Sequence, residues 1–144
     1  MKRWSKVMLA VGLVALLAGM LLACGGGGDG VSFGGGGSSA ASTPEQTVRN
    51  LLSAMQSLDV ERMAACCMGE ALQEVRDWDI PEGTRISISN ISIRVVSESA
   101  TEAQIAAEYD VSVTIPGEGI IEAREFQTYH LMNVGGSWYI DEVS

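Results

Sequence analysis

The sequence predicts an α+β fold, in which three N-terminal helices pack on a curved, four-stranded antiparallel sheet within residues 43–144. Two observations support this prediction. Apolar residues recur at the helical period between Val48 and Val75, and from Ile86 onward they alternate with polar residues, as in strands that bury one face. Short turns separate the strands, which indicates an antiparallel meander with helices on one side.

The first helix is expected to begin at residue 44. Thr43 can serve as its N-cap, Pro44 suits the first helical position, and Gln46 completes a capping box. The apolar stripe of this helix consists of Val48, Leu51, Leu52, Met55 and Leu58.

Two shorter helices are predicted next. Asp59 caps the second helix, which Gly69 is expected to end. A third helix is predicted over residues 70–78, before Pro81 and Gly83 turn the chain. One face of the second helix is apolar, with Val60, Met63, Ala64, Cys67 and Met68.

The first strand is predicted to be bent. In the stretch "TRISISNISIRVVS", Ile86 and Ile88 alternate with polar residues, and the alternation loses phase at Asn90. It resumes with Ile91, Ile93 and Val95. An extra residue that interrupts alternation is typical of a β-bulge, which bends its strand.

The second strand, within residues 101–115, alternates without a break and therefore has one dry face. A turn at residues 116–119 leads to a long third strand over residues 120–134, and Gly135-Gly136 leads to a last strand over residues 137–143. Trp138 and Ile140 lie two residues apart, so we expect them to share the dry face and to pack on the first helix. The dry face of the second strand is expected to hold Ala103, Ile105, Ala107, Tyr109, Val111, Val113 and Ile115, with Glu102, Gln104, Glu108 and Asp110 on the other face.

The N-terminus has the pattern of a secretory signal. "MKRWSK" is basic, and residues 7–23 form an uncharged apolar run of 17 residues. Leu21-Leu22-Ala23-Cys24 resembles the lipobox of bacterial lipoproteins, which implies a lipid on the Cys24 thiol and cleavage before it. Residues 1–23 are thus predicted to be a lipoprotein signal peptide, and residues 24–42 the lipidated cysteine and a Gly/Ser-rich tether. The alternative is an uncleaved membrane anchor.

The charge of the chain excludes some partners. Residues 24–144 contain six arginines, no lysine and eighteen acidic residues, a net charge of −12. Such a surface repels phosphates, so we expect no nucleic-acid partner and no direct attraction to anionic lipid headgroups. Membrane attachment is then expected to depend on the lipid at Cys24.

Residues 43–144 resemble the nuclear transport factor 2-like superfamily, also called the SnoaL-like or cystatin-like cone. The resemblance rests on Thr43-Pro44-Glu45 before an apolar helix, on Leu58-Asp59, on four strands, and on the final "GSWYID". It implies that the sheet curls around the first helix and leaves a cone-shaped pocket. In some members this pocket holds the acid/base pair of an isomerase, dehydratase or cyclase, whereas other members only bind or associate.

The candidate pocket residues are Tyr109, Glu125, Tyr129 and His130. His130 is the one histidine; if it points inward it can pair with Tyr109, and if outward it is an ordinary surface residue. Glu125 interrupts an apolar stretch and is the carboxylate that could turn inward. Acid/base catalysis needs a titratable group in the pocket with a polar partner in reach. No catalytic residue is assigned, and we expect no cofactor.

The stretch "MAACCMGE" holds thiols and thioethers that suit a soft metal such as Cu(I). Adjacent helical residues diverge by about 100° around the axis, so Cys66 and Cys67 cannot both face one ion. We therefore expect no metal site and no disulfide, with Cys67 buried in the apolar stripe and Cys66 at its margin.

Two functions remain in view. The first is a membrane-anchored extracytoplasmic lipoprotein of the bacterial cell envelope that acts as a non-catalytic binding or assembly module. It would hold a small ligand or an envelope protein in the cone, or form a homodimer through the outer face of its sheet. The alternative is a small enzyme of the isomerase or dehydratase type that uses the cone pocket.

Overall fold

A computed structural model describes residues 40–144 of the protein. The predicted signal peptide, Cys24 and the predicted tether up to residue 39 lie outside the described residues. No helix in the described part of the chain combines the length and apolarity needed to cross a membrane.

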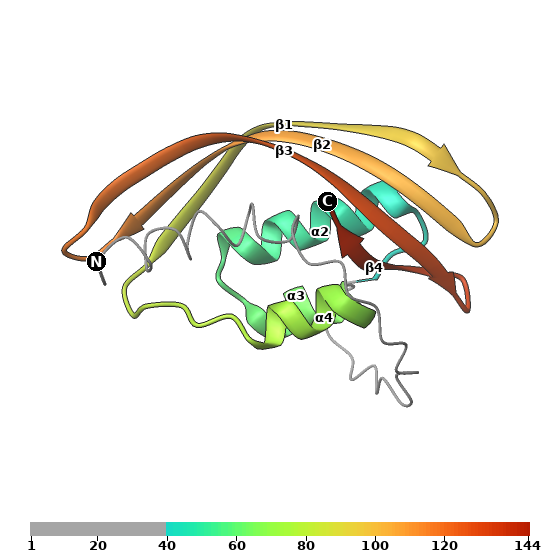
Figure 1. The fold of residues 1–144 in the computed structure, drawn as a ribbon, viewed down its shortest axis with the longest axis horizontal. Helices are drawn as coiled ribbons and strands as arrows, with labels where there is room; N and C mark the ends of the chain where they lie inside the picture. The colour runs from blue at the N-terminus through green and yellow to red at the C-terminus, as the bar shows by residue number, and fades with distance from the viewer. Residues whose placement is uncertain (1–39) are drawn as a thin grey trace.

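The predicted architecture is confirmed. Within residues 40–144, three helices are followed by four strands, which form one antiparallel sheet in the order β1-β2-β3-β4. The sheet arches over the helices, so its concave face is turned toward α2 (Figure 1). The helices are α2 (Pro44–Gln56), α3 (Val60–Ala65) and α4 (Gly69–Arg76), and the strands are β1 (Arg85–Glu98), β2 (Glu102–Ile115), β3 (Gly119–Val134) and β4 (Ser137–Val143).

The predicted helix starts are confirmed at α2 and α3. Thr43 Oγ1 accepts a hydrogen bond from the Gln46 backbone N–H at 3.3 Å, and the Asp59 carboxylate accepts one from Arg62 N at 3.1 Å. The Gln46 side chain donates to Asn50 Oδ1 at 2.9 Å. Both α2 and α3 therefore begin where a side chain satisfies one of the first backbone N–H groups, whereas α4 has no such cap.

The prediction that the second helix continues to Gly69 is wrong. α3 ends at Ala65, and Gly69, at a φ of 56°, is the first residue of α4. The intervening segment pairs with β4: Ile140 N donates to Cys66 O at 2.9 Å, and Met68 N donates to Ile140 O at 2.8 Å. These long-range hydrogen bonds replace the helical ones that the local pattern predicted.

The predicted bulge in β1 is confirmed. The pairing of β1 with β2 shifts between Ser89 and Ser92, and Asn90 has a φ of 52°. A second shift follows between Val95 and Ser97. The alternation predicted that the apolar residues of β1 beyond the first bulge are buried, but this half of the edge strand is less covered. Val95 is 39% exposed, whereas Ile88, before the bulge, is 8% exposed.

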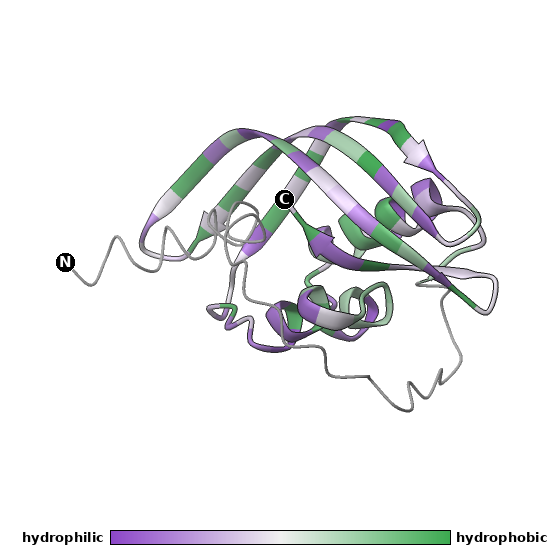
Figure 2. Ribbon diagram, turned by 45° about the vertical axis from the view of Figure 1, so that its right-hand side comes forward, coloured by the Kyte–Doolittle hydropathy of each residue, from purple (hydrophilic) through white to green (hydrophobic). Residues whose placement is uncertain are grey.

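The concave face of the sheet and the helices form one apolar core. Apolar and polar residues alternate along the strands (Figure 2), and all seven inward residues of β2 are buried. Trp138 and Ile140 belong to the same buried cluster as Leu51, Leu52 and Met55, which agrees with the shared face predicted for β4.

The described chain begins along the edge of β4 that does not pair with β3. Ala41 pairs with Trp138, whose N–H donates to Ala41 O at 2.9 Å. Thr47, on the first turns of α2, is fully buried, and its Oγ1 accepts from Ala41 N at 3.0 Å and donates to Trp138 O at 2.9 Å. This one hydroxyl therefore joins the entering chain, α2 and β4.

Candidate functional site

Three of the four candidate pocket residues lie on the concave face of the sheet. In the register of β2 and β3, Tyr109 is opposite Glu125, and Tyr129 is opposite Ile105. Both tyrosines are 1% exposed, and their hydroxyl oxygens lie 3.5 Å apart. The strand period brings these residues together, because side chains two residues apart share a face.

Burial sets the charge states of this cluster. It raises the pKa of Tyr109 to about 12 and that of Tyr129 well above its ordinary value, so both phenols are neutral at physiological pH. Desolvation also raises the pKa of Glu125, while a hydrogen bond from Gln127 lowers it. Glu125 is half-buried, so its carboxylate can accept a hydrogen bond or a proton from a bound molecule.

Gln127 belongs to this cluster although the sequence analysis did not single it out. It lies opposite Ala107, on the same face as Glu125 and Tyr129, and is 6% exposed. Its place two residues from each of them on β3 is the signal that could have identified it.

His130 lies on the outer face of the sheet, away from the tyrosine pair. It is opposite Gln104 of β2 and Glu142 of β4, and its Nε2 is 3.4 Å from Ser144 Oγ. The inward alternative, in which His130 pairs with Tyr109, is therefore wrong. His130 borders an outer groove of about 360 Å³ that also includes Asp141.

Cys66 and Cys67 are both buried, as predicted for Cys67, but Cys66 is fully buried rather than at the margin. The reason is that Cys66 follows the end of α3 and bonds to β4 instead of lying on a helix surface. Burial raises the pKa of the Cys66 thiol to about 12, and that of Cys67 is raised as well. Among residues 40–144, no group of three or more Cys, His, Asp and Glu side chains could hold a metal ion.

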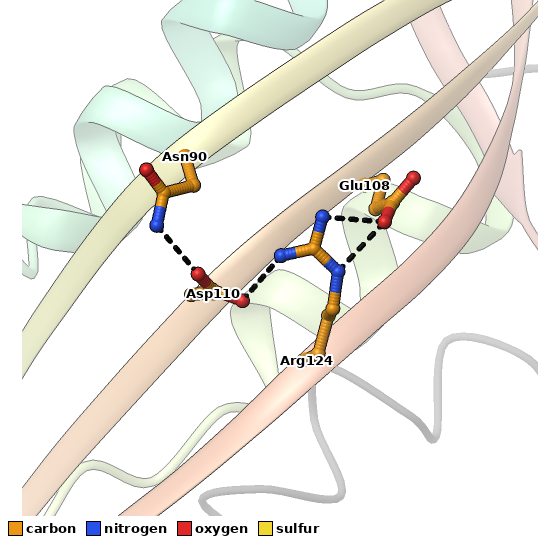
Figure 3. A network of polar contacts seen from close by, with 4 residues as sticks. All are labelled: Asn90, Glu108, Asp110 and Arg124. Carbon is orange, nitrogen blue, oxygen red and sulfur yellow. Dashed lines mark hydrogen bonds and ion pairs between the residues drawn. The ribbon is translucent and has the colours of Figure 1, made fainter.

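The outer face carries a polar network that the sequence analysis placed only in part (Figure 3). Glu108 and Asp110 lie there, as expected from the alternation along β2, and both contact Arg124. Arg124 Nε donates to Glu108 Oε1, and Arg124 Nη1 donates to Asp110 Oδ1, both at 2.6 Å. Asn90 Nδ2 donates to Asp110 Oδ2 at 2.7 Å. The missed signal was the opposite charge of Asp110 and Arg124, which face each other in the register.

Comparison with known proteins identifies the fold. No protein-family model matches the chain, and no curated protein matches it. A ketosteroid isomerase-like protein from Erwinia carotovora atroseptica is 18% identical, with a TM-score of 0.58 over 69% of this chain and 88% of that one. A hexachlorocyclohexane dehydrochlorinase (LinA), Type2, is 15% identical, with a TM-score of 0.51 over 69% of this chain and 81% of that one.

At these identities the likeness concerns the fold. It agrees with the nuclear transport factor 2-like cone that the sequence resemblance implied for residues 43–144. Function has to be argued from the residues of this chain, because one fold hosts many activities.

Proposed function

We propose that the protein is a lipid-anchored component of the bacterial cell envelope, with its domain outside the cytoplasm. The basic start, the apolar run over residues 7–23 and the lipobox-like "LLAC" before a glycine-rich stretch support an anchor on Cys24. Two modifications would then produce the anchored protein: a lipid is attached to the Cys24 thiol, and the chain is cleaved before Cys24.

The domain acts as a non-catalytic binding module. This proposal rests on the side chains of β2 and β3 that face the concave side of the sheet. They include one carboxylate, Glu125, and two neutral phenols. The Tyr109 and Tyr129 hydroxyls are buried against each other, and His130 is on the other face. These two strands therefore provide no acid/base pair that faces a bound molecule. An apolar surface with one hydrogen-bond acceptor is suited to binding a mainly apolar ligand.

The half-exposed part of this face defines the binding position. Ile121, Ala123 and Glu125 lie on the inward row of β3 and are each partly exposed, while their partners on β2 are buried. A small, mainly apolar molecule would pack on Ile121 and Ala123 and donate a hydrogen bond to Glu125.

One observation favours the alternative, an isomerase- or dehydratase-type enzyme. Glu125 lies opposite a tyrosine on the concave face, and desolvation raises its pKa toward the range of a general base. Two solved structures with this fold are described as ketosteroid isomerase-like and as a dehydrochlorinase. On this alternative Glu125 removes a proton from the substrate.

The anchor is tested with Cys24→Ser in a bacterial host fed with labelled palmitate. The natural chain should take up label and lose residues 1–23, and the variant should do neither. A processed natural chain whose intact mass shows an unmodified thiol would contradict the anchor.

The module is tested with the neutral apolar probe N-phenyl-1-naphthylamine, whose fluorescence rises in an apolar site. Ala123→Trp should block the probe, whereas Glu122→Trp, on the adjacent residue that faces outward, should not. Equal binding by both variants would refute the concave position.

Glu125→Gln separates binding from catalysis. The amide keeps the size of the side chain and can hydrogen bond, but it cannot take up a proton. A binding module should tolerate this change in complementation of a deletion strain, whereas an enzyme should lose its function while the probe still binds.

A further inference from the structure

On the outer face of the sheet, a group of polar side chains lies beside the exposed aromatic residue Phe126. Opposite Glu108 on β2 is Phe126 on β3, and opposite Asp110 is Arg124. Asn90 reaches Asp110 from the bulge of β1. We call these five residues the outer patch. They come from three adjacent strands and lie on one face, and Figure 3 shows the four polar ones.

The polar groups of the outer patch are held in place and remain accessible. The Arg124, Glu108 and Asp110 side chains are 46%, 37% and 38% exposed. The contacts of Arg124 with Glu108 and Asp110 use one N–H group on each of Nε, Nη1 and Nη2. A guanidinium has five N–H groups in all. Two donors, together with Glu108 Oε2 and Asn90 Oδ1 as acceptors, are thus left for a bound molecule.

A groove adjoins this network on the side of the β2–β3 turn. Its volume is about 470 Å³, within the range of small-ligand sites. Its lining includes Asp110 and Arg124 and three serines, Ser87, Ser89 and Ser112, together with Val111, Glu122 and Ala123. Each hydroxyl can both donate and accept a hydrogen bond, so the groove suits a ligand rich in hydroxyl groups.

Phe126 supplies an apolar platform beside the same network. Phe126 is 67% exposed and lies across from Glu108 on the outer face. An exposed aromatic ring next to fixed polar groups can pack on the apolar C–H face of a sugar ring while the polar groups bind its hydroxyls.

The net negative charge of the outer patch and its groove restricts which ligands can bind there. Glu108 and Asp110 outnumber Arg124, and Glu122 adds another negative charge at the groove. Hydrogen bonds from Asn90 and Arg124 lower the pKa of Asp110, so it stays an ionised acceptor. An anionic ligand such as a phosphate or a uronic acid is repelled here, and a neutral one is not.

We propose that the outer patch and its groove form a second binding surface, separate from the concave face, which takes a neutral carbohydrate. The sugar hydroxyls bond to Asn90, Glu108, Arg124 and the groove serines, and one sugar ring packs on Phe126. This inference depends neither on the lipid at Cys24 nor on a ligand at Glu125.

The test is a titration of the full chain, kept in dodecylphosphocholine, which has no sugar headgroup. The probes are maltotetraose, cellotetraose, tetra-N-acetylchitotetraose and mannotetraose, which are neutral, with tetragalacturonic acid as the anionic comparison. We expect at least one neutral probe to shift the NMR signals of the Asn90 amide and the Arg124 Nε–H group saturably. The anionic probe should not shift them.

Two variants and one control locate the site. Phe126→Ala, and Arg124→Lys, which keeps the charge but loses the planar fork, should each weaken binding about tenfold or more with the circular dichroism unchanged. Ile120→Ala is the control, because Ile120 is also 67% exposed on the outer row of β3 but lies outside the patch. It should change the affinity by less than about twofold.

Three results would overturn the proposal. The first is that none of the four neutral probes shifts the Asn90 and Arg124 signals. The second is that tetragalacturonic acid binds as well as the neutral probes. In the third, dilution of the protein alone shifts the same signals, which would mean that a second copy of the chain covers the patch. The naphthylamine assay on the concave face can succeed or fail independently of all three.

Discussion

Replacing Thr47 with valine should weaken the domain more than most single substitutions. The residue is fully buried, and its hydroxyl accepts from Ala41 N and donates to Trp138 O. Valine has nearly the same shape but no hydroxyl, so the change removes both hydrogen bonds. A buried carbonyl left without its partner costs about 1–3 kcal/mol and a lost partly exposed hydrogen bond about 1 kcal/mol, so we expect the free energy of unfolding to fall by about 2–4 kcal/mol.

Urea denaturation followed by tryptophan fluorescence measures this loss. The midpoint should fall with the slope unchanged, because the surface exposed on unfolding is the same. Thr114→Val, at a half-exposed position on the outer row of β2, is the matched control and should change stability by less than about 0.5 kcal/mol. A loss below about 1 kcal/mol for Thr47→Val, or one equal to the control, would show that the hydroxyl is not the link between entering chain, α2 and β4.

Three further predictions concern the core and the concave face. Trp138→Ala should cost about 3–5 kcal/mol, because the side chain is 4% exposed; a Tm within a few degrees of the natural chain would argue against this packing. Cys66 and Cys67 should stay unreactive toward Ellman's reagent at pH 8 and react only after denaturation, since burial raises both thiol pKa values; rapid labelling of the folded chain would contradict this. Because desolvation raises the pKa of Glu125 in the folded state above its ordinary 4.5, ionisation of Glu125 lowers stability as the pH rises from that value through its folded pKa. Glu125→Gln should therefore reduce the fall in stability over this window, and an unchanged pH profile of the urea midpoint would count against the shift.

Local sequence signals were enough to predict most of the fold. The caps at Thr43 and Asp59, the bulge at Asn90 and the alternation in β2 each depend on residues close in the chain. The role of Gly69 could not be predicted in this way, because the segment before it bonds to β4, about seventy residues later.

The same limit applies to the sites. Alternation along β2 and β3 indicated which residues could share a face, and Tyr109, Glu125 and Tyr129 do share one. The side on which His130 lies depends on the pairing of β3 with its neighbours, as does the contact of Arg124 with Asp110. Pairing register follows from long-range packing, so it was beyond the reach of local patterns.

The Ala41–Trp138 pairing also has a consequence for how the domain would be attached. Asn133 N donates to Thr101 O at 2.8 Å, so the β1–β2 and β3–β4 turns lie at one end of the sheet, and the chain leaves the domain beside Trp138 at that same end. With Cys24 as the proposed anchor, the chain from the membrane would join the domain at this end, opposite the β2–β3 turn. The 16 residues of β3 span at most about 50 Å, at about 3.3 Å per residue, so the β2–β3 turn would lie up to about that distance from the point of attachment.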